Sequence, residues 1–160
     1  MMMHLSSDVI KALAGKSLVT AESCTGGGIG AALTAISGSS AVYKGGIISY
    51  TNWVKENVLG VPGEMLSQYG AVSQPVAQAM AEGARKVLQA DVAISVTGLA
   101  GPGGDEYGNP VGIVFIGYAD SQKSYAQKHL FTGSREEVRD QAVCEALKLL
   151  LNEHKPAGRI

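Results

Sequence analysis

Two hydroxyls and a thiol stand directly before three glycines in the segment Ser23-Cys24-Thr25-Gly26-Gly27-Gly28. The residues before it are typical of a strand and those after it of a helix. The segment should therefore open a helix, where free backbone N–H groups favour an anion or a developing oxyanion. It has neither the lysine of a Walker A loop nor the spacing of the dinucleotide fingerprint. It suits a serine nucleophile, with Thr25, Gly26 and Gly27 as substrate-binding candidates, or else a plain helix cap with close helix–sheet packing.

A serine nucleophile needs a base, and Lys55 is the candidate. His4, His129 and His154 fall outside the expected strand-end loops, which argues against a Ser-His-Asp arrangement. Lys55 follows a strand end by about one helical turn, and a lysine that loses water has its pKa lowered toward a value at which it accepts a proton. A solvated surface lysine is the alternative. Tyr50, at the same strand end, either adds a hydroxyl to the site or is a core tyrosine.

A second glycine-rich segment begins at Thr97 and reads Thr97-Gly98-Leu99-Ala100-Gly101-Pro102-Gly103-Gly104. Its backbone N–H groups are suited to line a substrate amide or ribose, with Thr97 and Gly98 as the binding candidates. A flexible loop is the alternative.

Two arginines, Arg135 and Arg139, are four residues apart and so share one face of an expected helix. Together they can clamp a phosphate, although ion pairs with the neighbouring Glu136 and Glu137 explain them equally well. Cys24 is either a reactive thiolate at a helix N-terminus or a small buried residue.

The elements that must position these residues alternate between strands and helices. Strands are expected at residues 17–22, 43–50 and 91–97, with a hairpin at 111–118 and 123–131. Helices are expected at 6–15, 29–36, 52–59, 75–90 and 135–154, with a loop or a single helical turn at 63–70. Ser6 or Ser7 should cap the first helix, and Ser73 the helix over 75–90.

This alternation predicts an α/β sandwich around a mixed sheet that is mostly parallel, with one antiparallel strand. Ligands of such sheets gather beyond the carboxyl ends of the parallel strands. The glycine turns after Glu22 and after Thr97 should therefore share one edge of the sheet.

Length and composition narrow the class of protein. With 160 residues, 46% of them apolar, the chain is suited to one globular domain over residues 1–160, with fraying expected at 155–160. With a net charge of −1, the chain has no overall excess of positive charge that would attract nucleic acid or an anionic membrane. No apolar run reaches the length of a bilayer span. The two cysteines form no CxxC pair and the histidines are scattered, so we expect no disulfide and no metal. The chain is expected to be cytoplasmic.

Five groups of residues together resemble the CinA C-terminal domain family in content and order. They are Ala21-Glu22-Ser23-Cys24-Thr25-Gly26-Gly27; Ser49-Tyr50-Thr51-Asn52 with Lys55 and Leu59-Gly60-Val61; Gly70-Ala71-Val72-Ser73; Val96-Thr97-Gly98-Leu99-Ala100-Gly101-Pro102-Gly103-Gly104; and Pro110-Val111-Gly112. Members of that family hydrolyse the carboxamide of nicotinamide mononucleotide, which gives nicotinate mononucleotide and ammonia. The chain is similar to the form in which this domain stands alone.

The resemblance implies roles for individual residues. Ser23 matches the catalytic serine and Lys55 the partner that accepts its proton, Tyr50 and Thr97 match substrate-site hydroxyls, and Arg135 or Arg139 matches an arginine near the phosphate. It also implies a three-layer α/β/α sandwich, a small-molecule nucleotide as the substrate, no cofactor, and a homo-oligomer, specifically a dimer. One departure is visible, because many relatives have a lysine where this chain has Asn109.

Two other functions remain open on the residues alone. The first is a non-catalytic module of the same fold that binds a nucleotide or another protein. The second is a hydrolase of a different small amide, which would keep Ser23 and Lys55 and change the pocket.

Overall fold

The structure is a computed structural model that describes residues 2–155. The helices are α1 (Met2–Ala12), α2 (Gly28–Thr34), α3 (Asn52–Asn57), α4 (Gly63–Tyr69), α5 (Gln74–Val87) and α6 (Arg135–Glu153), and a 3-10 turn covers Ser39–Ala41. The strands are β1 (Leu18–Glu22), β2 (Tyr43–Ile48), β3 (Val92–Gly98), β4 (Ile113–Ala119) and β5 (Ser124–Leu130). The fraying expected at the C-terminus concerns residues 156–160 for the most part, which lie outside the described residues.

The strands form one sheet in the order β2-β1-β3-β4-β5. β1 pairs in parallel with both β2 and β3, whereas β4 is antiparallel to both β3 and β5. Four strands therefore point the same way and β4 alone opposes them, which confirms the predicted mixed sheet with one antiparallel strand. After β1 the chain passes to β2 on one side, and β3 then returns on the other side of β1. The direction of winding thus reverses between β1 and β3, and ligands of open α/β sheets bind at such a point.

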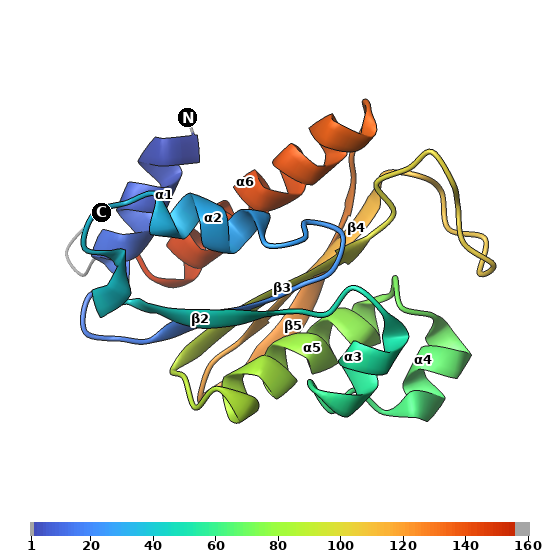
Figure 1. Cartoon of the computed structure of the whole chain (residues 1–160), viewed down its shortest axis with the longest axis horizontal. Coiled ribbons are helices and arrows are strands. Elements are labelled where there is room, and N and C mark those ends of the chain that lie inside the picture. The colour runs from blue at the N-terminus through green and yellow to red at the C-terminus, as the bar shows by residue number, and fades with distance from the viewer. Residues whose placement is uncertain (1, 156–160) are drawn as a thin grey trace.

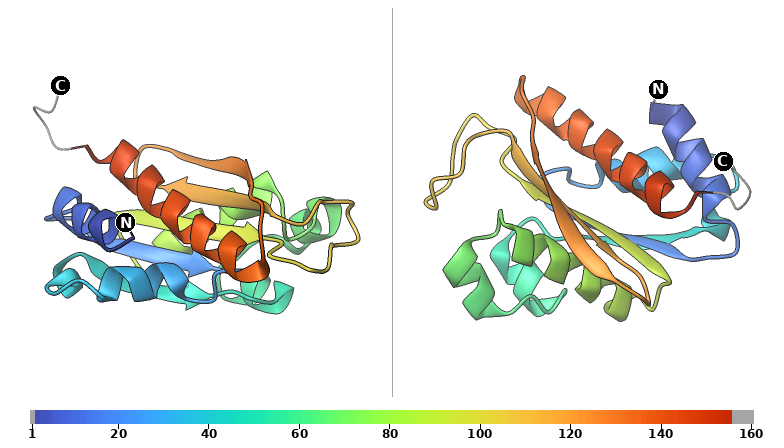
Figure 2. Two further views of the ribbon diagram at one scale, coloured as in Figure 1. Left: turned by 90° about the horizontal axis from the view of Figure 1, so that it is seen from above. Right: turned by 180° about the vertical axis from the view of Figure 1, so that it is seen from behind.

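Helices cover both faces of the sheet and make the expected three layers. Figure 1 shows α1, α2 and α6 on one face and α3, α4 and α5 on the other, and the two views of Figure 2 show the same layers from above and behind. β1, β3 and β4 are buried along almost their whole length, because each has apolar or small side chains on both faces. A Cβ at Gly117 would collide with the carbonyl of Ala77 in α5, so this glycine lets the helix lie close against β4.

The helices differ from the sequence expectations in three places. α1 begins at Met2, and the Ser6 hydroxyl donates to the Met2 carbonyl within the helix, so the predicted cap at Ser6 or Ser7 is wrong. Ser73 does precede α5, but its hydroxyl donates to the Gly70 carbonyl, 2.8 Å away, and caps no backbone N–H of the helix. Residues 63–69 form the two-turn helix α4, longer than the loop or single turn expected, because Leu66 is buried in the core that α5 forms with the sheet.

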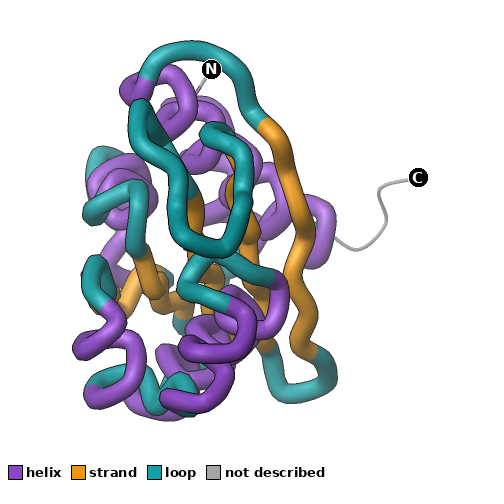
Figure 3. Tube along the Cα trace, turned by 90° about the vertical axis from the view of Figure 1, so that its right-hand side faces the viewer, coloured by secondary structure: helices purple, strands orange, loops and turns teal. Residues whose placement is uncertain are grey.

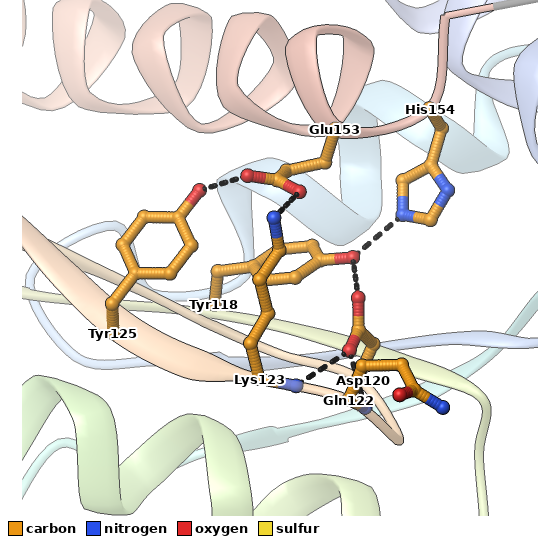
Figure 4. Close-up of polar contacts among 7 residues, drawn as sticks. All are labelled: Tyr118, Asp120, Gln122, Lys123, Tyr125, Glu153 and His154. Atoms are coloured by element: carbon orange, nitrogen blue, oxygen red, sulfur yellow. Dashed lines mark hydrogen bonds and ion pairs between the residues drawn. The ribbon is translucent and has the colours of Figure 1, made fainter.

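A polar network joins the C-terminal end of α6 to the β4–β5 hairpin (Figure 4). The buried Tyr118 hydroxyl donates to the Asp120 carboxylate at 2.7 Å and lies 2.8 Å from Nε2 of His154. Glu153, in the last turn of α6, pairs with Lys123 Nζ at 2.7 Å. These contacts hold α6 against the end of the sheet where β3 begins, which leaves the opposite end, where β1 and β3 finish, to the loops that follow them. Within residues 2–155, no helix combines the length and the apolar character needed to cross a bilayer.

Candidate active site

The loops that follow β1, β2 and β3 gather at one end of the molecule, which Figure 3 views directly. They enclose a cleft of about 290 Å³. Its lining comes from all three loops, from the chain before α5 and from the first turn of α6: Ser23, Cys24, Tyr50, Asn52, Lys55, Ala71, Val72, Thr97, Gly98, Leu99, Ala100, Gly101, Gly103 and Arg135. The two glycine turns thus do share one edge of the sheet, as the sequence predicted.

Ser23 and Lys55 meet at the floor of this cleft. The backbone N–H of Ser23 donates to the Val96 carbonyl at 2.9 Å, which fixes the residue just beyond the paired part of β1 and β3. Lys55 reaches the same place from α3, where Thr51 caps the helix by accepting a hydrogen bond from a backbone N–H in its first turn. Lys55 Nζ lies 3.0 Å from Ser23 Oγ and 2.6 Å from the Ser49 carbonyl oxygen.

Burial changes the acidity of Lys55. Its side chain is 1% exposed, and loss of water disfavours the charged ammonium, which lowers the pKa of Lys55 from 10.5 to about 8. A neutral amine in this position keeps an N–H for the Ser49 carbonyl and presents its lone pair to the Ser23 hydroxyl. The pair can therefore exchange a proton, which is the chemistry that activates a serine nucleophile.

The turn that carries Ser23 is held from inside by Glu22. This carboxylate, 2% exposed, accepts hydrogen bonds from the Thr25 hydroxyl at 2.6 Å and from the backbone N–H groups of Ile29 and Gly30 at 2.8 and 3.0 Å. The carboxylate thereby pairs free backbone N–H groups in the first turn of α2, where the helix favours an anion. The N-cap of α2 is Gly27, with φ of 104°, so the alternative that Ser23 or Thr25 caps this helix is wrong.

The three predicted binding residues after Cys24 do not line the cleft. Thr25 is buried with its hydroxyl committed to Glu22, Gly27 lines a separate hollow beside Tyr43 and Ile48, and Gly26 faces the Arg139 guanidinium. Both glycines have positive φ, 59° for Gly26 and 104° for Gly27. They therefore serve the shape of the turn, since an L side chain is strained in this backbone conformation.

Thr97, Gly98 and Tyr50 do line the cleft. The Thr97 hydroxyl donates to the Ala71 carbonyl at 2.9 Å, which ties β3 to the chain before α5. Tyr50 is 59% exposed at the mouth, so it is no core tyrosine. Its hydroxyl lies 3.4 Å from Arg135 Nη2.

The two arginines of α6 have different surroundings. Arg135 lines the cleft and donates from Nη1 to the Gly101 carbonyl at 2.7 Å. Arg139 is half-buried outside the lining and donates from Nε to the Cys24 carbonyl at 3.0 Å and from Nη2 to the Thr25 carbonyl at 3.2 Å. No contact within hydrogen-bonding range joins either guanidinium to Glu136 or Glu137, among the described residues, which removes the ion-pair alternative.

Cys24 also borders the cleft, as a neutral thiol. Its side chain is buried, and burial raises its pKa to about 11. A reactive thiolate needs the opposite shift, so the structure favours the alternative of a small buried residue.

Sequence reasoning missed several parts of the site. No role was assigned to the Ser49 carbonyl that holds Lys55, or to the walls formed by Asn52, Ala71 and Val72, although these residues lie in segments that carry the family resemblance. Asn109, the position at which the sequence was expected to depart from the family pattern, donates to the Asp105 carboxylate at 2.7 Å and to the Val72 carbonyl at 3.1 Å, and so shapes the loop between β3 and β4. Among residues 2–155, no three His, Cys, Asp or Glu side chains lie together as metal ligands would.

The fold and the cleft define a class of α/β sandwich in which a buried lysine contacts a serine at the carboxyl edge of the sheet. The model of the CinA C-terminal domain family matches residues 3–154, and the chain belongs to this family.

Curated relatives and solved structures agree with this assignment. The CinA-like protein of Parasynechococcus marenigrum (strain WH8102) is 49% identical over 138 residues, which cover 85% of this chain and 33% of that protein, and that of Anaeromyxobacter sp. (strain K) is 46% identical over 136 residues, with the same coverage. The chain thus spans about a third of the length of these relatives.

Two solved structures match almost end to end. A CinA superfamily protein from Klebsiella pneumoniae 700603 has a TM-score of 0.93 at 38% identity, covering 96% of this chain and 97% of that one. The competence/damage inducible protein CihA from Agrobacterium tumefaciens has a TM-score of 0.91 at 39% identity, covering 94% of each chain.

Proposed function

We propose that the chain is an amidohydrolase that converts nicotinamide mononucleotide to nicotinate mononucleotide and ammonia. The observation that carries the proposal is the 3.0 Å contact between Ser23 Oγ and the buried Lys55 Nζ, at the floor of a cleft. A lysine with a pKa of about 8 is partly neutral near physiological pH, so it can serve as a general base. The family resemblance supplies the substrate.

In the first step Ser23 Oγ attacks the carboxamide carbon of the substrate while its proton passes to neutral Lys55. A C–O bond forms and the amide oxygen becomes an oxyanion. When the tetrahedral intermediate collapses, the C–N bond breaks and Lys55 returns the proton to the departing ammonia. Water then attacks the ester at Ser23, with Lys55 again as base, and releases the carboxylate.

The turn at residues 24–28 offers few free donors for the oxyanion. The backbone N–H groups of Gly26 and Gly28 donate to the carbonyls of Ser23 and Thr25. Those of Cys24, Thr25 and Gly27 have no hydrogen-bond partner among residues 2–155, and the first two stand directly after the nucleophile. Of these residues Cys24 lines the cleft, so its N–H is the donor of this turn that is placed for the developing charge.

The other end of the cleft suits the phosphate. Arg135 is exposed at the mouth, next to Tyr50, and its guanidinium has donors left after the bond to Gly101. Arg135 is the arginine of α6 that can meet a bound nucleotide, since both contacts of Arg139 go to backbone carbonyls of the 23–28 turn.

The test is an assay of ammonia release from nicotinamide mononucleotide, nicotinamide riboside, nicotinamide and a set of amino-acid amides, with Ser23→Ala as the matched control for contaminating activity. Ammonia from the mononucleotide that disappears in Ser23→Ala supports the proposal. Nucleotide binding without ammonia would indicate the binding module, and turnover of another amide alone would indicate a different hydrolase. The expected dimer also stays a prediction, which light scattering checks against the chain mass of 16.5 kDa.

A further inference from the structure

The peptide groups directly after Ser23 accept hydrogen bonds from Arg139, a residue of the C-terminal helix α6. Arg139 donates from Nε to the Cys24 carbonyl at 3.0 Å and from Nη2 to the Thr25 carbonyl at 3.2 Å. These contacts bridge more than a hundred residues of sequence, since Arg139 lies in the second turn of α6. A half-buried arginine that serves two adjacent carbonyls fixes two successive peptide planes with one rigid group.

Fixing these carbonyls also fixes the N–H groups on their other side. In a planar trans peptide the C=O of one residue and the N–H of the next point in opposite directions. Because the Cys24 carbonyl points at Arg139, the Thr25 N–H points away from it, and this N–H has no hydrogen-bond partner among residues 2–155. Because the Thr25 carbonyl also points at Arg139, the Gly26 N–H points back and donates to the Ser23 carbonyl at 3.1 Å.

The turn is therefore held from two sides. Glu22 holds it from within through the Thr25 hydroxyl and the start of α2, and Arg139 holds it from α6. α6 also packs tightly here, since a Cβ at Gly28 would lie 3.0 Å from Val143 Cγ2, one helical turn beyond Arg139. The guanidinium also lies against Gly26, because a Cβ there would be in ordinary van der Waals contact with Arg139 Nη2, 3.5 Å away.

We propose that Arg139 is a positioning residue for catalysis, which orients the peptide groups after Ser23 and so aims the nucleophile, while Arg135 serves the substrate. The proposal rests on the proposed function, because it assigns a role within that same site. It assigns different roles to two arginines that lie four residues apart on one helix face. A misplacement of reacting groups by about 1 Å is enough to cost about 100-fold in rate. Loss of the two Arg139 hydrogen bonds should therefore lower kcat.

The experiment compares Arg139→Ala and Arg135→Ala on nicotinamide mononucleotide and on nicotinamide riboside, which lacks the phosphate. We expect Arg139→Ala to lower kcat by about 100-fold on both substrates, with each KM changed by less than about threefold. Arg135→Ala should instead raise KM for the mononucleotide and leave the riboside nearly unchanged. Lys148→Ala, on the exposed part of α6, is the control for substitution of this helix and should match the wild type.

Two further measurements separate a misaligned turn from a damaged fold. A lysine at position 139 retains the charge and one hydrogen bond, so Arg139→Lys should recover part of the lost kcat. Guanidinium ion added to Arg139→Ala should do the same, while the melting temperature of that variant stays the same with and without it. Either rescue would show that the missing cationic hydrogen-bond donor at position 139, and not a general loss of structure, limits the rate.

Ser23 reactivity can also be measured without any amide substrate. A phosphonofluoridate forms an Oγ–P bond with an activated serine as the P–F bond breaks, fluoride leaves and the hydroxyl proton passes to Lys55. Labelling of Ser23 in Arg139→Ala should slow by a factor similar to that in kcat. If the wild type is labelled but releases no ammonia from the mononucleotide, the proposed substrate is wrong and the positioning role still stands.

Three results would overturn the positioning role itself. The first is unchanged kcat and unchanged labelling in Arg139→Ala. The second is a loss confined to KM for the mononucleotide, which would place Arg139 at the phosphate. The third is a folded Arg139→Ala that is inactive and that neither lysine nor guanidinium rescues.

Discussion

Lys55 and Ser23 form their contact where water hardly reaches, and this isolation gives the lysine its chemical use. A surface lysine stays protonated at neutral pH, whereas Lys55, 1% exposed, has a pKa of about 8. The same burial explains why the Ser49 carbonyl lies 2.6 Å from Nζ, since a buried amine needs a partner for its N–H.

Lys55→Arg distinguishes a base from a mere positive charge. Arginine keeps the charge but stays protonated in proteins, so it cannot accept the proton of Ser23. We expect this variant to be almost as inactive as Lys55→Ala in the ammonia assay. The Ser23→Ala/Lys55→Ala double variant should be scarcely slower than either single one, because residues of one catalytic unit are not additive. Turnover near that of the wild type in Lys55→Arg would remove Lys55 as the base.

The pH dependence of kcat/KM should report the same lysine. Below a pKa of about 8 the amine is protonated and inactive as a base, so kcat/KM should fall about tenfold per pH unit toward acid and level off above that pKa. An acid limb centred near pH 6 or lower would contradict this assignment.

The stability of the protein should also respond to Lys55, with a definite sign. Its pKa is about 8 when folded and 10.5 as a free side chain, so between these values the unfolded chain holds a proton that the folded one has released. The free energy of unfolding should therefore rise with pH across this window. Below the window both states hold the proton, so the stability gained within it is absent there. Lys55→Met should abolish this part of the pH dependence, as measured by urea denaturation at several pH values.

At the scale of elements, the β4–β5 hairpin and α6 depend on one buried hydroxyl. Tyr118→Phe removes the donor to Asp120 and the partner of His154, and we expect it to lower the free energy of unfolding by about 1–2 kcal/mol, the cost of leaving buried polar groups unpaired. Activity should be unchanged, because Tyr118 pairs with Ile94 at the end of the sheet away from Ser23. Tyr125→Phe, at a less buried hydroxyl on the same hairpin, is the matched control and should cost less. A loss of kcat in folded Tyr118→Phe would show that this network reaches the cleft.

The strands and long helices follow from sequence pattern, whereas the short helix α4 does not. Residues 92–98 are apolar on both faces and had to be a central strand. Residues 63–69 begin at a glycine after Pro62, with no capping side chain, so their helix depends on burying Leu66 against α5. Local sequence carries no sign of that distant partner.

At the scale of the whole molecule, the cleft exists because four separate parts of the chain end at one edge of the sheet. Ser23 follows β1, Lys55 comes after β2, Thr97 and Gly98 close β3, and Arg135 opens α6. The reversal of winding between β1 and β3 leaves a gap there that side chains do not fill.

Turnover of the mononucleotide should be unchanged by EDTA and by added zinc. Ser23 and Lys55 supply the nucleophile and the base, and no cluster of metal-binding side chains occurs among residues 2–155. Ammonia release before and after dialysis against the chelator checks this. Loss of activity that zinc restores would overturn the serine–lysine mechanism.

The sequence alone determined the strand–helix alternation, the mixed sheet, and Ser23 and Lys55 as the candidate pair. These follow from the spacing of apolar residues along the chain and from motifs a few residues long. Only the tertiary structure decided that Thr25, Gly26 and Gly27 shape the turn and do not line the cleft, and that Arg139 grips backbone while Arg135 faces the cleft. The physical reason is that a side chain's role depends on what packs against it. The nearest polar partners of Arg139 lie more than a hundred residues away in sequence, and the lowered pKa of Lys55 arises from burial that no local pattern reports.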